Sequence, residues 1–161
     1  MPLDPSVLFN ALLKLSTTDK PPDAFTAASR VASAYREYAA AASSLGFPLV
    51  TPGPGVVTMD LALGSAFAVL PGAPPVVAAG FVSMITLYWT GAIFAGVPLP
   101  GVAAPPVLAP AMLPILTALL VVPNPAEVYA TAVATALHTA TLSTLVTFPQ
   151  PSGPPIIGPV V

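Results

Sequence analysis

The sequence predicts an all-α fold, with several short helices separated by proline-rich loops and an extended C-terminal tail. Its apolar runs are long and rich in alanine, whereas strands are short, alternating and β-branched. The 23 prolines are spread along the whole chain, so they divide it into short pieces. Helix-start signals stand at Asp4-Pro5, at Asp23 and at Asn124-Pro125, where a capping side chain precedes the first turn.

Residues 1–46 are expected to form an amphipathic helical hairpin. The first helix is predicted from Asp4 to about Ser16. The second is predicted from Asp23 to Leu45, where Gly46 would supply the C-terminal stop. An apolar stripe at helical spacing runs along the second helix and is rich in alanine, which allows close helix packing.

Three further regions follow the hairpin. Residues 47–55 are rich in proline and glycine and read as a linker. Residues 56–148 are predicted to be an apolar helical region. Its expected helices cover 57–70, 76–97, a proline-kinked segment at 107–122, and 126–148. Residues 149–161 read as an extended proline-rich tail that either hangs free or, as its apolar residues favour, lies along a neighbouring molecule.

Charge is confined to the N-terminal part. Eight of the ten charged residues lie within the first 37 positions, and the other two are Asp60 and Glu127. Charged residues make up 6% of the chain, against about a quarter in ordinary soluble proteins. With 55% hydrophobic residues, region 56–148 must be covered either by lipid or by other protein chains. Four basic residues cannot build a nucleic-acid surface, so that class of partner is excluded.

No catalytic or cofactor site is expected. The chain has no cysteine and one histidine, His138, so neither a metal centre nor an acid–base pair can be assembled, and no small-molecule substrate is indicated. Asp60 has two interpretations, an ion carrier within a membrane or a helix-start carboxylate, and the second is favoured. His138 is either a metal ligand or a polar position on the last helix, and again the second is favoured. The sequence therefore predicts a protein that is not an enzyme.

The sequence leaves two alternatives for what covers the apolar region. The run 76–97 has 22 residues without charge or proline, which is long enough for a transmembrane helix, so a small integral membrane protein with one to three spans is one alternative. The favoured alternative is a homo-oligomer that also contacts other structural subunits. Aromatic residues are the expected interface contacts: Tyr35, Tyr38, Phe81, Tyr88, Trp89 and Phe94.

The order of local motifs resembles that of small alanine- and proline-rich virion proteins of tailed bacteriophages. The matching pieces are Pro21-Pro22, Ala34-Tyr35-Arg36-Glu37-Tyr38-Ala39, Val97-Pro98-Leu99-Pro100-Gly101, Leu137-His138-Thr139-Ala140 and Pro151-Ser152-Gly153-Pro154. Val31 departs from the resemblance, because such helices often carry Trp near that position. The resemblance implies a multi-copy structural component of a virion, of the tail or baseplate, with no catalytic residues.

Overall fold

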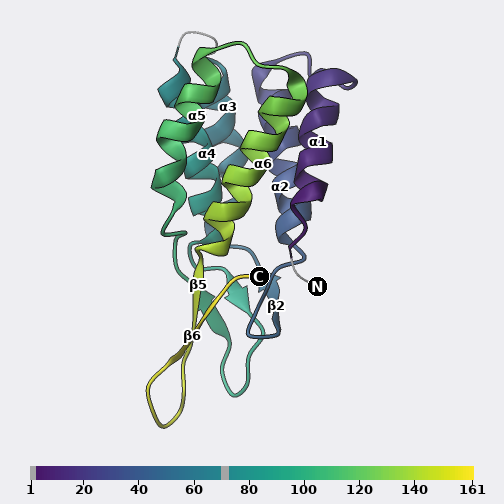
Figure 1. Ribbon diagram of the computed structural model, residues 1–161. Coiled ribbons are helices and arrows are strands. Elements are labelled where there is room, and N and C mark those ends of the chain that lie inside the picture. The colour runs from purple at the N-terminus through teal and green to yellow at the C-terminus, as the bar shows by residue number, and fades with distance from the viewer. Residues whose placement is uncertain (1–2, 70–72) are drawn as a thin grey trace.

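Helices form one end of the molecule and a small sheet forms the other (Figure 1). The computed structural model describes residues 3–69 and 73–161. The helices are α1 (Pro5–Thr17), α2 (Ala24–Ala39), α3 (Met59–Phe67), α4 (Pro74–Trp89), α5 (Met112–Val121) and α6 (Ala126–Leu142), with short 3₁₀ turns η1 (Pro54–Val57) and η2 (Ala109–Ala111). The strands are β1 (Ser43–Ser44), β2 (Phe47–Thr51), β3 (Ile93–Phe94), β4 (Gly101–Ala103), β5 (Leu145–Phe148) and β6 (Ile156–Pro159).

The prediction of an all-α fold is wrong, because six short antiparallel strands follow one another around a nearly closed sheet. The predicted helices at 23–45, 76–97 and 126–148 all end early, at Ala39, Trp89 and Leu142, and the residues after each enter a strand. Strands of two to five residues are too short for an alternating pattern to be recognised. Inside the sheet, the side chains of Phe94, Val146 and Phe148 are buried.

The segment expected to be a linker, 47–55, contains strand β2. Gly46, which directly precedes it, was predicted to end a helix but has a different role. Leu45 and Gly46 have positive φ values of 52° and 83°, and they connect Ser44 directly to Phe47 across a two-residue hairpin loop. Positive φ at both loop positions matches the twist of paired strands. Gly46 therefore turns a β-hairpin, and the glycine that follows a helix is instead Gly91, at φ 76° after α4.

The C-terminal tail belongs to the sheet of its own chain. Strand β6 pairs along its whole length with β5. Past β6, Ser43 and Val161 exchange backbone hydrogen bonds of 3.0 and 2.8 Å, and Ser44 pairs with Val160. The last residues thus connect the end of the sheet to its beginning, whereas the sequence suggested a free tail or contact with a neighbour.

The chain is built from three successive units, each containing two helices and a β-hairpin. They are α1–α2 with β1–β2, α3–α4 with β3–β4, and α5–α6 with β5–β6. Around the helical end each helix packs on the next in sequence, and α6 packs on α1, so the ring is closed. In the sheet, β2 pairs with β3 and β4 pairs with β5, and Val160, directly after β6, pairs with Ser44 of β1.

Equivalent backbone hydrogen bonds show that the three units are related residue by residue. After the second helix of each unit, an amide bonds back three residues at 2.9–3.1 Å. These bonds are Ala42 to Ala39, Ala92 to Trp89, and Thr144 to Thr141. The carbonyl of each of these donor residues accepts at 2.8–3.0 Å from an amide of its own unit, at Leu49 in β2, at Ala103 in β4 and at Val160 directly after β6. Ala39, Trp89 and Thr141 therefore occupy one position of a threefold repeat, although their side chains differ completely.

Two of the three predicted helix starts are confirmed. Asp4 accepts a hydrogen bond from the Ser6 amide and Asp23 accepts one from the Thr26 amide, each at 2.8 Å. The prediction for Asn124 is wrong: its side-chain amide donates to the carbonyls of Leu119 and Val122, at the end of α5, and Pro125 precedes α6 instead. Asn124 therefore terminates one helix and leaves the next without a side-chain cap.

Candidate functional site

The six aromatic residues predicted as interface contacts lie in the interior of this chain. None of Tyr35, Tyr38, Phe81, Tyr88, Trp89 and Phe94 is more than 2% exposed. Several of their rings pack edge to face, as in the pairs of Tyr88 with Tyr35 and with Trp89. Their packing partners are residues of the same chain, so a surface for neighbouring subunits has to come from other side chains.

A buried hydrogen-bond chain connects the second helices of all three units. Trp89 of α4 donates its indole N–H to the Tyr35 hydroxyl of α2 at 2.7 Å. The Tyr35 hydroxyl lies 2.7 Å from that of Thr141 on α6, and Thr141 donates its own proton to the carbonyl of Leu137 at 2.8 Å. The Tyr35 proton must therefore point to Thr141. Burial raises the pKa of Tyr35 well above its usual value, so the hydroxyl stays protonated. This network is structural, because every polar atom in it is already satisfied within the chain.

His138 lies at the edge of the core, where Nδ1 is 2.6 Å from the Tyr38 hydroxyl. Partial burial lowers the pKa of His138 below its ordinary value, and the negative charge of Asp4 opposes this effect. In the neutral ring that is protonated on Nε2, Nδ1 can accept the proton of the Tyr38 hydroxyl. Within residues 3–69 and 73–161, His, Asp and Glu side chains form no cluster that could hold a metal ion.

Asp60 lies in the first turn of α3 and is paired with a cation. The two terminal guanidinium nitrogens of Arg36, Nη1 and Nη2, donate to its two carboxylate oxygens at 2.8 and 3.1 Å, and the Ser29 hydroxyl donates at 3.3 Å. This fork joins α2 of the first unit to α3 of the second. About a third of each of the Arg36 and Asp60 side chains remains exposed.

The long apolar run at 76–97 is divided between two elements. Helix α4, Pro74–Trp89, contains residues 76–89 of the run, and the chain then turns at Gly91 into β3. Over the described part of the chain, no helix has both the length and the apolar character needed to cross a membrane.

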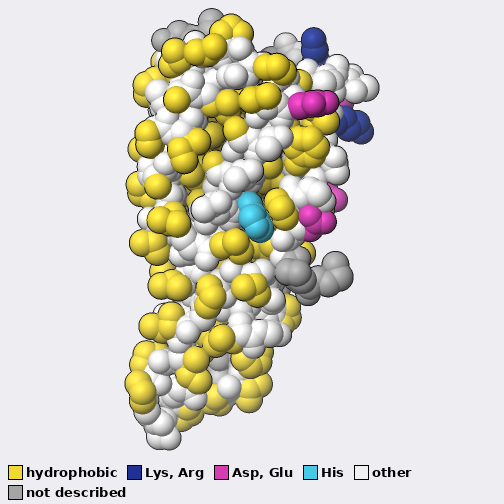
Figure 2. Space-filling model, in the orientation of Figure 1, with side chains coloured by type: hydrophobic (Ala, Val, Ile, Leu, Met, Phe, Trp, Pro, Cys, Tyr) yellow, Lys and Arg dark blue, Asp and Glu magenta, His cyan; other side chains and the backbone are white. Residues whose placement is uncertain are grey.

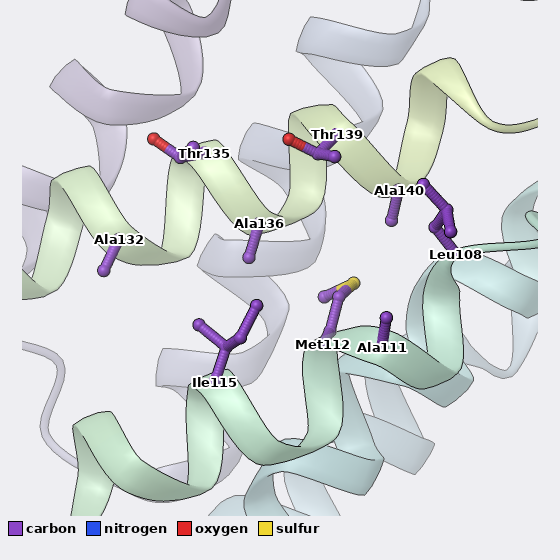
Figure 3. A pocket seen from close by; sticks show the side chains of 9 residues that line it. All are labelled: Leu108, Ala111, Met112, Ile115, Ala132, Thr135, Ala136, Thr139 and Ala140. Atoms are coloured by element: carbon purple, nitrogen blue, oxygen red, sulfur yellow. The ribbon is translucent and has the colours of Figure 1, made fainter.

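The most distinctive surface feature is an uncharged groove between α5 and α6, with a volume of about 310 Å³. Its lining residues are Leu108, Ala111, Met112, Ile115, Ala132, Thr135, Ala136, Thr139 and Ala140. Figure 3 shows the alanines of α6 facing Ile115 and Met112 of α5, while the two threonine hydroxyls point away from the space between the helices. An apolar partner that enters this groove would therefore contact methyl groups and a thioether.

The threefold repeat places a second groove, between α1 and α2, in the equivalent position. Counting back from Thr141 and from Ala39, Ala132 corresponds to Arg30, Thr135 to Ser33, Ala136 to Ala34 and Thr139 to Glu37. The four first-unit residues do line a groove, of about 480 Å³, together with Lys14 and Asp19. The two grooves share one fold position but have opposite chemistry, because the first contains four charged side chains and the other none.

Exposed apolar side chains line the uncharged groove and continue along the segments that form it. Leu108, Ile115, Val121, Val122 and Val128 are 47–63% exposed. Figure 2 shows the charged side chains of this view gathered on the side where Figure 1 places α1, and hydrophobic ones over α5 and the strands. We call the surface formed by the groove and these five residues the α5–α6 face. The scarcity of charge in the sequence predicted an apolar surface. The aromatic side chains that were expected to form it are buried, and aliphatic side chains form it instead.

Ala132, Ala136 and Ala140 provide the one sequence signal that could have located the groove, because their four-residue spacing puts three small side chains on one side of α6. Comparison with models of protein families, with curated proteins and with solved structures finds no match to this chain.

Proposed function

We propose that this protein is a structural, non-enzymatic subunit of a large multi-copy assembly, and that the assembly is a bacteriophage virion. The observation that carries the proposal is the α5–α6 face, where a groove without charge is bordered by half-exposed aliphatic side chains. Contiguous apolar surface of this kind marks an interaction site, because leaving it in water is unfavourable. The motifs shared with tailed-phage structural proteins are what suggest a virion as the particle.

The internal bonding of the polar groups also favours a structural role. Tyr35, Trp89 and Thr141 satisfy one another, and Asp60 is paired with Arg36. A reaction needs a polar group that remains available to a substrate. His138, the residue with the most versatile chemistry, has one ring nitrogen engaged by Tyr38.

A small integral membrane protein is the second candidate, and it rests on the apolar character of residues 76–97. Fractionation of the source material separates the two. Particles are sedimented on a density gradient, membranes are floated in parallel, and the chain is detected by mass spectrometry in each fraction. Recovery in particles that contain no lipid supports the assembly. Recovery only in membranes, with release by detergent, would reject it in favour of the membrane protein.

A further inference from the structure

We propose that the α5–α6 face binds the same face of a second copy of this chain, across a twofold axis. This inference rests on the proposed function, because it names the surface through which copies of the subunit associate. The charge, the shape and the area of the face all fit a second copy.

Charge excludes the first-unit groove as the partner surface. The equivalent groove of the first unit contains Lys14, Asp19, Arg30 and Glu37. Placing that surface against the uncharged groove would remove four charges from water without supplying any new partner, which is strongly unfavourable. The α5–α6 face of another copy has a groove without charge, so two such faces can be buried against each other at no such cost.

Shape makes the face self-complementary. On α6, Ala132, Ala136 and Ala140 leave a shallow channel, because small side chains recur every four residues. On α5, Ile115 forms the adjoining rim and is 55% exposed. A twofold axis repeats each contact in both directions, so the Ile115 side chain of each copy can enter the alanine channel of the other.

The single charge near the face fits this arrangement. Glu127 lies in the first turn of α6, nine residues before Ala136 and therefore away from the middle of the helix. When two α6 helices cross in antiparallel directions, the two Glu127 carboxylates lie at opposite ends of the contact. They remain at the rim in solvent, where a charge costs little.

The available area is of the order that a stable pair requires. A typical specific interface takes about 800 Å² from each partner, which is roughly a tenth of the 7697 Å² accessible surface of this chain. With 17 residues α6 is about 26 Å long, α5 with 10 residues is about 15 Å long, and two adjacent helices are about 20 Å wide. Side-chain relief raises the accessible area of a face of this size above its flat projection, toward the required value.

The test compares matched lysine substitutions in the full-length chain. Ile115→Lys places a charge in the proposed contact. Leu61→Lys is the control, because Leu61 is 63% exposed and lies on α3, the helix of the second unit that corresponds to α5. Sedimentation velocity over a range of concentrations gives the dimer dissociation constant, and circular dichroism establishes that each variant is folded. We expect Ile115→Lys to raise the constant about tenfold or more and Leu61→Lys to leave it close to that of the original chain.

Cysteine crosslinking provides an independent measurement, because the native chain has no cysteine. Ile115→Cys should give a covalent dimer with a short bismaleimide, and Leu61→Cys should not. Any one of three results would overturn the inference. The two cysteine variants could crosslink equally, the two lysine variants could have equal dissociation constants, or the original chain could stay monomeric at high concentration. Recovery of the same chain in purified particles would still support the proposed function in any of these cases, so the two failures are distinguishable.

Discussion

At the scale of single residues, stability is concentrated in the hydrogen bonds that connect α2, α4 and α6. Tyr35 both accepts and donates in that chain, and its side chain is fully buried. Removing one polar group from such a network leaves its partners in an apolar environment without replacement bonds.

Tyr35→Phe removes the hydroxyl but keeps the ring. The indole N–H of Trp89 then has no acceptor, and we expect a loss of about 1–3 kcal/mol in the free energy of unfolding. Glu37→Ala, on the exposed side of the same helix, should cost less than about 0.5 kcal/mol. Urea unfolding followed by Trp89 fluorescence measures both. A Tyr35→Phe variant as stable as the Glu37→Ala variant would show that the network does not stabilise the fold.

The pH dependence near neutrality should come from His138. Because its pKa is lowered in the folded protein, the unfolded chain binds more protons once the pH falls below about 6.5. The free energy of unfolding should therefore decrease as the pH falls from about 6.5 through the lower folded pKa. The exposed carboxyl groups of Asp4 and Asp23 also have lowered pKa values, but their contribution is lost only at more acidic pH, below about 4.

His138→Gln keeps a side chain that can accept the Tyr38 proton but does not titrate. We expect unfolding free energies measured at pH 7.5 and 5.5 to differ less in this variant than in the original chain. An unchanged difference between the two pH values would mean that the titration resides elsewhere.

At the scale of elements, the sheet holds the three units in a closed ring. Strand β6 does this by pairing with β5 on one side, while Val160 and Val161 just beyond it bond to β1 on the other. Without it, two strand edges of the chain are exposed, and exposed edges favour aggregation.

Deleting residues 156–161 should therefore lower the thermal midpoint by several degrees and broaden the transition, because the connection between the third and first units is lost. Replacing the exposed loop residues Pro151 and Ser152 with glycines, which leaves β5 and β6 in place, is the control and should change the midpoint little. Circular dichroism melts measure both. A deletion variant that melts like the original chain would mean that β6 does not hold the ring closed.

Helices could be predicted from this sequence better than strands could. The helix starts at Asp4 and Asp23 were predicted correctly because a capping side chain acts within three residues of itself. The strands were missed because each has at most five residues, and the sheet depends on pairing between strands of different units as well as within each hairpin. The repeat was also hidden, since Ala39, Trp89 and Thr141 share a position but no chemistry.

The candidate surface could be predicted in part. Composition indicated an apolar exterior, but the aromatic residues were assigned to it, and packing buries them inside the helical ring. Buried aromatic and exposed aliphatic positions are separated by tertiary packing, which a linear pattern does not contain. The difference between the two equivalent grooves became visible only once the units could be aligned in space.

At the scale of the whole molecule, charge is distributed unevenly around a repeating fold. The first unit contains most of the charged residues, while the third has Glu127 alone. One fold position thus gives a solvent-compatible groove in one unit and an apolar groove in another. We interpret this asymmetry as the basis of assembly, with the first unit facing water and the third facing another copy.

Sedimentation equilibrium of the full-length chain in plain buffer, over a series of salt concentrations, tests this interpretation most directly. We expect a mass of at least twice 16.1 kDa, with association that holds or strengthens as salt increases, because the contact is apolar and salt screens only charges. A single 16.1 kDa species at every concentration, or association that disappears in high salt, would show that the third unit does not face another copy.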